Sequence, residues 1–198
     1  LRQAFLSGEQ PQTCRKCWNE ERAGRTSKRM HTLDRLKHMG ITSEWTADAK
    51  PLMFLDLKLG NICNLKCRIC GSWSSSQFAT EELKFVANKK ESFHYTMLKD
   101  GAWPRESSEF WLELETTLTD IRYLEFTGGE PFLNPEMVTI LCETLKYGPA
   151  TVLTNGTVFK DEWLVALRDA ESRSLYSLEF RVSIDGFSPE SNDPIRGE

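Results

Sequence analysis

Three cysteines lie close together in the run Cys63-Asn64-Leu65-Lys66-Cys67-Arg68-Ile69-Cys70, shortly after a strand-like segment at residues 54–58. Thiolates are soft ligands that suit iron–sulfur clusters, copper(I) or zinc. One loop of three thiolates can hold three corners of a cuboidal four-iron cluster, which leaves the fourth iron without a protein ligand. Because a working metal site keeps one position open, the spacing favours a reactive iron–sulfur centre. The alternatives are a zinc knuckle with a distant fourth ligand, or a disulfide pair with a spare thiol.

The rest of the chain alternates between two kinds of pattern. Short apolar segments typical of β-strands occupy residues 52–58, 122–127, 150–154 and 178–184. Helical spacing of apolar residues is found over residues 73–87, 107–118, 135–145 and 163–170. Residues 88–105 show no clear period, and we expect them to form a surface excursion. Strand–helix alternation predicts parallel βα units, and such units bring the carboxyl ends of their strands to one face.

Three further segments stand where predicted strands end. They read Phe126-Thr127-Gly128-Gly129-Glu130-Pro131, Thr154-Asn155-Gly156 and Ser183-Ile184-Asp185-Gly186. Taken alone, Gly-Gly-Glu and Asn-Gly are ordinary turn sequences. Because each follows or closes a predicted parallel strand, however, all three should meet the cysteine loop at the same mouth of the fold.

In their order and spacing, the four segments resemble the radical S-adenosylmethionine (radical SAM) enzymes, and the last two resemble the SPASM/twitch branch of that family. The resemblance covers roughly residues 51–198 and implies an α/β fold, a partial (βα) barrel of the radical SAM type. The family's barrel has six strands, whereas about four are visible here. We therefore expect a truncated chain whose core, residues 51–198, is incomplete at its C-terminus and follows a small, mainly helical N-terminal segment, residues 1–50.

The resemblance also implies the chemistry. Cys63, Cys67 and Cys70 would hold a [4Fe–4S] cluster whose open iron chelates S-adenosylmethionine. Reductive cleavage of that cofactor would yield a 5′-deoxyadenosyl radical, which abstracts hydrogen from a peptide or small-molecule substrate. An external electron donor such as flavodoxin or ferredoxin is implied as well. The sequence assigns no residue to the reacting hydrogen itself.

Cofactor contacts are expected from Ile69, Gly128, Gly129, Glu130, Asn155, Ser183, Asp185 and Arg196. Ile69 stands where the family often has an aromatic residue against the adenine, and an aliphatic side chain can pack there too. The two glycines allow the backbone to approach the cofactor's amino group. Glu130 either accepts a hydrogen bond from that ammonium or orients the turn.

The last three expected contacts concern the ribose and carboxylate groups of the cofactor. Ser183 and Asp185, at a strand end, are placed to bond the ribose hydroxyls or the carboxylate. The guanidinium of Arg196 suits the methionyl carboxylate.

The N-terminal fifty residues contain a second cysteine motif, Cys14-Arg15-Lys16-Cys17. Two thiolates alone do not complete a metal site, so this turn is half of a zinc site, a redox pair, or part of an auxiliary iron–sulfur cluster, as the twitch resemblance implies. Its remaining ligands would then lie upstream of Leu1. Cys142, in contrast, lies on an apolar helical stripe and is predicted to be a core residue.

Composition limits the partners. The chain has 198 residues and a formal net charge of −4, which gives no general attraction to nucleic acid or to an anionic membrane. Its six cysteines read as metal ligands in a reducing compartment, so a cytoplasmic protein is expected.

Two rival hypotheses remain: a zinc-binding interaction module without catalysis, and a radical SAM enzyme that modifies RNA. The RNA hypothesis is favoured by the excess of basic residues over positions 15–37, where eight residues are basic and three are acidic.

Overall fold

The computed structural model describes residues 1–40, 52–101 and 107–196. The chain divides into two compact units, Leu1–Lys50 and Pro51–Glu198. Among the described residues, no helix has both the length and the apolar character needed to cross a membrane.

The first unit is helical and packs around one tryptophan. It contains α1 (Arg2–Leu6), the 3-10 helix η1 (Gln12–Cys14), α2 (Arg15–Arg22) and α3 (Lys28–His38). Trp18 is buried, with the Phe5 ring 5.9 Å away and the Arg29 guanidinium 4.6 Å from its centroid. Helix α3 is capped at its start, because the Ser27 hydroxyl accepts a hydrogen bond from the Met30 amide.

The second unit is built on one parallel sheet. Its strands are β1 (Phe54–Leu57), β2 (Tyr123–Phe126), β3 (Ala150–Thr154) and β4 (Leu178–Val182), in the order β1-β2-β3-β4. The register pairs Leu57 with Phe126, Phe126 with Val152, and Thr154 with Val182. The predicted α/β architecture with parallel βα units, consistent with a partial barrel, is confirmed.

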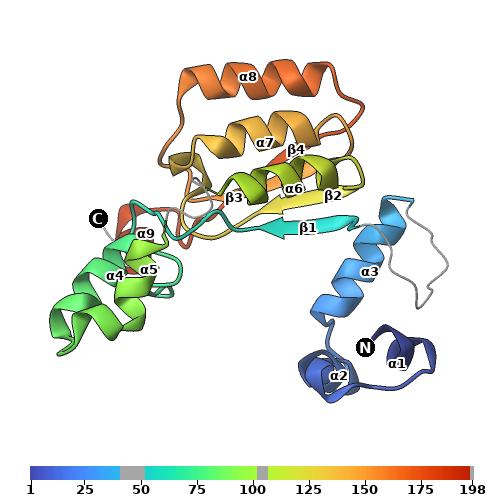
Figure 1. The fold of residues 1–198 in the computed structure, drawn as a ribbon, viewed down its shortest axis with the longest axis horizontal. Coiled ribbons are helices and arrows are strands. Elements are labelled where there is room, and N and C mark those ends of the chain that lie inside the picture. The colour runs from blue at the N-terminus through green and yellow to red at the C-terminus, as the bar shows by residue number, and fades with distance from the viewer. Residues whose placement is uncertain (41–51, 102–106, 197–198) are drawn as a thin grey trace. The chain divides into compact units, whose positions relative to one another are not determined.

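Helices cover one face of this sheet. They are α6 (Ser108–Leu118), α7 (Glu136–Thr144) and α8 (Asp161–Ser172), which lie on the same side of the strands in Figure 1. Side chains alternate between the faces of a strand, so one face of the sheet is apolar and packs on these helices. The buried core comprises Leu57, Leu59, Leu114, Leu118, Ile121, Leu124, Phe126, Phe132, Met137, Val138, Ile140, Leu141, Ala150, Val152 and Leu167.

The other face of the sheet is polar. Asp56 pairs in register with Glu125, Glu125 with Thr151, and Thr151 with Glu179, which makes a polar row across all four strands. The Thr151 hydroxyl donates to the Glu179 carboxylate at 3.2 Å, and Thr127 donates to Asp56 at 2.8 Å. In a βα barrel this face is the interior.

The remaining helices gather where the strands end. Figure 1 shows α4 (Ser76–Glu82), α5 (Phe93–Lys99) and α9 (Pro189–Arg196) near the ends to which the strand arrows point. Short 3-10 helices complete the unit: η2 (Leu83–Phe85), η3 (Lys89–Glu91) and η4 (Pro131–Leu133).

Within the segment expected to form a surface excursion, residues 88–101 contain η3 and α5, and neither helix has a buried residue. The Ser92 hydroxyl accepts a hydrogen bond from the Tyr95 amide at 3.2 Å, and α5 packs on α4. Capping and tertiary packing therefore stabilise a helix whose apolar spacing is weak. Residues 102–105 lie outside the described part of the chain.

The core predicts a clear stability contrast. Leu124 in β2 is fully buried, so Leu124→Ala should lower the free energy of unfolding by about 2–5 kcal/mol. Leu112 on α6 is 66% exposed, and Leu112→Ala should change it by about 0.5 kcal/mol or less. Urea denaturation followed by circular dichroism measures both, and equal effects would contradict the described core.

Candidate functional site

The cysteine loop closes on itself after β1. The Cys70 amide donates to the Cys67 carbonyl at 2.8 Å, and the Ser75 hydroxyl donates to the Leu65 carbonyl at 2.7 Å. The Leu65 amide donates a hydrogen bond to the Cys63 sulfur at 3.4 Å. Cys67 is buried, while Cys63 and Cys70 are partly exposed. All three predicted ligands thus belong to one folded loop.

Burial disfavours the thiolate forms of Cys63 and Cys70. It raises the pKa of Cys63 and of Cys70 above the usual thiol value, and the neighbouring Cys67 raises the pKa of Cys70 further. Arg196 acts in the opposite direction on Cys70. Since a metal binds the thiolate, loading this loop must release protons.

The chemistry of the donor set suits an iron–sulfur cluster, because three thiolates are soft ligands that iron–sulfur clusters prefer. In the part of the chain that the structure describes, no three Cys, His, Asp or Glu side chains gather closely enough for one metal ion.

The Gly-Gly-Glu segment contacts this loop through its backbone. Gly128 and Gly129 both have positive φ, +79° and +36°, which favours glycine. A Cβ atom on Gly129 would overlap the Ile62 carbonyl oxygen, the last peptide before Cys63. The Glu130 amide donates to that same oxygen at 2.8 Å. The end of β2 is therefore fixed against the start of the cysteine loop.

The Glu130 side chain points into the protein and is 2% exposed. Its carboxylate accepts hydrogen bonds from the Phe132 amide (3.0 Å), the Thr154 hydroxyl (2.7 Å) and the Asn155 amide (2.8 Å). Of the two roles expected from the sequence, the geometry supports orientation of the turn. These bonds tie the end of β2 to the end of β3.

Asn155 does more than form an Asn-Gly turn, because its side chain bonds to the cysteine loop. Its side-chain amide donates to the Asn64 Oδ1 atom at 2.9 Å, and Asn64 Nδ2 donates to the Thr157 hydroxyl at 2.8 Å. The segment after β3 is thus bonded to the cysteine loop. Sequence reasoning missed Asn64 and Thr157, because their partners lie about ninety residues apart.

A cavity of about 670 Å³ opens beside the loop. Its lining combines the end of β4, the start of α9 and parts of both bonded loops: Leu65, Asn155, Thr157, Ser183, Ile184, Gly186, Phe187, Ser188, Pro189, Asn192, Asp193 and Arg196. Ligand pockets commonly have about 300–1,000 Å³, so a nucleoside-sized molecule fits. Three expected contacts, Asn155, Ser183 and Arg196, therefore line one space.

The expected contacts Asp185 and Arg196 are bonded to each other. They form an ion pair in which the two side chains are 28% and 14% exposed. Arg196 Nη1 also lies 3.8 Å from the Cys67 sulfur, and the Arg68 amide donates to the Ile195 carbonyl at 2.7 Å. Helix α9 is therefore held against the cysteine loop, with the guanidinium at the cavity wall.

The structure also describes the remaining predicted residues, Ile69, Cys142, Cys14 and Cys17. Ile69 is 72% exposed on the cysteine loop, with its side chain open to a ligand. Cys142 lies on α7 against the core, and burial raises the pKa of its thiol. Cys14 and Cys17 lie in the other unit, at η1 and α2.

Sequence reasoning also missed Lys58. This side chain donates to the Trp73 carbonyl at 2.5 Å, and burial lowers the pKa of its ammonium. It therefore fixes the segment that follows Cys70 to the end of β1.

Comparison with known proteins gives one result. A family model described as the Radical SAM superfamily matches residues 57–198, which is well over half of the chain. No curated protein matches the chain. The matched range begins at the last residue of β1 and contains the whole sheet beyond it, the cysteine loop and the cavity.

The hydrogen bonds of Glu130 predict that the substitution Glu130→Gln lowers the free energy of unfolding. In Glu130→Gln an NH₂ group replaces one acceptor oxygen, so a buried donor loses its partner, and we expect a loss of about 2 kcal/mol in the free energy of unfolding. The matched control is Glu115→Gln, on the exposed surface of α6. Urea denaturation of both variants decides the point; equal stability of the two would show that the carboxylate does not join the strand ends.

Proposed function

The chain belongs to the radical SAM superfamily, and on that premise we propose that Cys63, Cys67 and Cys70 hold a [4Fe–4S] cluster beside a cavity that binds S-adenosylmethionine. When bound, the reduced cluster and this cofactor together supply a 5′-deoxyadenosyl radical that abstracts a substrate hydrogen. The observation that carries the proposal is the convergence of four separate segments on one loop and one cavity.

We assign binding roles to residues according to their positions. The positive-φ glycines present bare backbone next to the loop, where an amino group can approach it. Ser183 and Asn155 offer a hydroxyl and an amide at the cavity wall for ribose or carboxylate oxygens. Arg196 offers its guanidinium to a carboxylate, shared with Asp185. Ile69 offers an exposed aliphatic surface for the adenine.

We further propose that the enzyme belongs to the SPASM/twitch branch and acts on a peptide or small molecule. The Thr154-Asn155-Gly156 and Ser183-Ile184-Asp185-Gly186 segments support this proposal through their likeness to that branch. Flavodoxin or ferredoxin would supply the electron. The six free thiols fit a reducing compartment, and we place the enzyme in the cytoplasm.

The cluster assignment is tested by single substitutions. Cys63→Ala, Cys67→Ala and Cys70→Ala in the full-length protein should each abolish formation of 5′-deoxyadenosine, because two thiolates do not hold a cuboidal cluster in this geometry. Cys142→Ala is the control and should retain iron, since that thiol packs on the hydrophobic core. After anaerobic reconstitution, iron analysis and chromatography of the nucleoside measure the effects. Normal 5′-deoxyadenosine from any of the three variants would overturn the assignment.

We also propose a second metal site at Cys14 and Cys17, most simply an auxiliary iron–sulfur cluster. The pair spans the junction of η1 and α2 in a unit that is separate from the core. Two thiolates leave a coordination shell incomplete, so at least one further cysteine of the full-length protein must join.

Metal analysis tests this second site. Compared with the intact protein, the double variant Cys14→Ala/Cys17→Ala should lose the auxiliary iron while keeping the iron bound by residues 63–70. Mössbauer spectroscopy separates the two populations. Identical iron in both proteins, with no zinc in either, would show that the pair binds no metal.

A further inference from the structure

The position of Cys70 depends on a residue that follows it. Between Cys70 and Ser72 stands only Gly71, and glycine has the widest conformational freedom of any residue. In this structure the Gly71 carbonyl accepts hydrogen bonds from the Ser74 and Ser75 amides at 2.9 and 3.0 Å, so Gly71 and Ser72 belong to one turn. An anchor at Ser72 therefore restricts where the Cys70 sulfur can lie.

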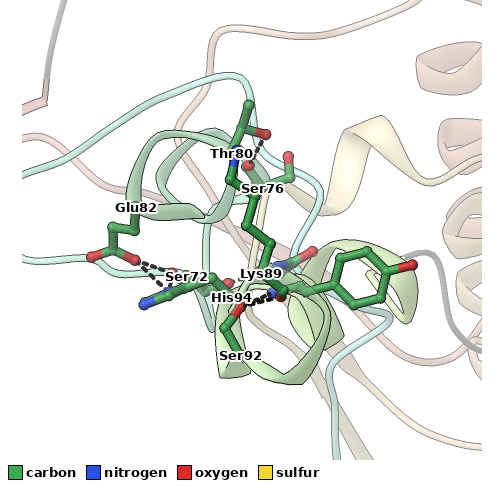
Figure 2. Close-up of polar contacts among 9 residues, drawn as sticks. Ser72, Ser76, Thr80, Glu82, Lys89, Ser92 and His94 are labelled. Atoms are coloured by element: carbon green, nitrogen blue, oxygen red, sulfur yellow. Dashed lines mark hydrogen bonds and ion pairs between the residues drawn. The ribbon is translucent and has the colours of Figure 1, made fainter. Parts of the chain in front are cut away.

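Ser72 is anchored at two points, although it is two residues from a metal ligand and on no helix or strand. It is 1% exposed, and its carbonyl accepts a hydrogen bond from Asn61 Nδ2 at 2.6 Å. Its hydroxyl bonds to the Glu82 carboxylate and lies 2.7 Å from Nδ1 of His94. Glu82 Oε2 in turn lies 3.0 Å from the same ring nitrogen. Figure 2 shows Ser72, Glu82 and His94 meeting in this triangle.

The triangle fixes which histidine nitrogen carries hydrogen. An ionised carboxylate only accepts hydrogen bonds, so both the Ser72 hydroxyl and the His94 ring must donate. His94 therefore carries a hydrogen on Nδ1. A nucleophilic triad is excluded, because there the carboxylate and the hydroxyl bond to opposite nitrogens of the ring, whereas here both meet Nδ1.

Local structure holds the two anchoring side chains. His94 lies in the first turn of α5, whose start is fixed by the Ser92 hydroxyl, and Ser92 also donates to the Lys89 carbonyl at 2.7 Å. Glu82 is the last residue of α4. The two helices pack on each other, so their polar side chains meet at the loop (Figure 2).

We propose that His94 and Glu82 are positioning residues for the cluster: through Ser72 they hold the Cys70 ligand where the iron requires it. The inference rests on the proposed function, since it assumes a cluster at Cys63, Cys67 and Cys70. In this proposal helices α4 and α5, which lie outside the sheet, carry the side chains that hold the cysteine loop in place. Groups that orient metal ligands typically change metal affinity by about 10–100-fold when they are removed.

The test uses two amide replacements of His94 that place their NH₂ groups at different positions. Asparagine places an NH₂ group near the site of Nδ1, whereas glutamine places its NH₂ group near the site of Nε2. His94→Gln and Ser72→Ala should therefore release iron to a ferrous chelator about tenfold faster than the wild type, and His94→Asn should restore the rate. Tyr95→Phe, an exposed change on the same helix, is the control.

Two further readouts separate positioning from general instability. Electron paramagnetic resonance of the reduced cluster should shift in His94→Gln and return in His94→Asn, while the melting temperature of the metal-free proteins should not follow that order. Unchanged iron release in both His94→Gln and Ser72→Ala would overturn the inference, as would a release rate that simply follows the melting temperature. If the wild-type protein itself binds no cluster, the proposed function fails and this inference fails with it.

Discussion

One buried glutamate joins the ends of the central strands to the segment that precedes the cysteine loop. Glu130 follows β2, receives hydrogen bonds from Thr154 and Asn155 at the end of β3, and donates its own amide to Ile62 before the cysteines. Hydrogen bonds to an ionised group are stronger than neutral ones, and burial makes each of them costly to leave unmade. Three strand ends that are distant in sequence are thereby held at fixed positions, and the loop and cavity depend on that arrangement.

Much of the fold could be predicted because its signals are local. The strand β3 and the capped start of α6 follow from apolar spacing and from Ser107. Helix α5 could not be predicted, because Ser92 and contact with α4 stabilise it more than its own pattern does.

The motifs predicted which segments form the site. They could not predict which side chains contact each other there, because the contacting residues are far apart in the sequence. The pairs Asn64–Asn155 and Asp185–Arg196 join parts of the chain that no periodicity connects. The choice between two roles for Glu130 likewise needed the geometry, since only the structure shows which donors its carboxylate meets.

The two sets of cysteines differ in how well the surrounding protein structure holds them. The loop at residues 63–70 is bonded to segments that follow β2, β3 and β4. Among the described residues of the first unit, in contrast, Trp18 is the one buried apolar side chain. A unit with so small a core gains much from a bound metal, because binding free energy adds to folding free energy. Metal at Cys14 and Cys17 would therefore have a structural effect as well as any electronic one.

The contact between Gly129 and the Ile62 peptide bears on which mutations the protein can accept. It joins two main-chain segments and uses no side chain of the cysteine loop. Substitutions at the exposed loop positions Lys66, Arg68 and Ile69 leave this contact intact, whereas any side chain at position 129 disrupts it. The loop thus combines a main-chain contact that excludes a side chain at position 129 with exposed positions where a change of side chain leaves that contact in place.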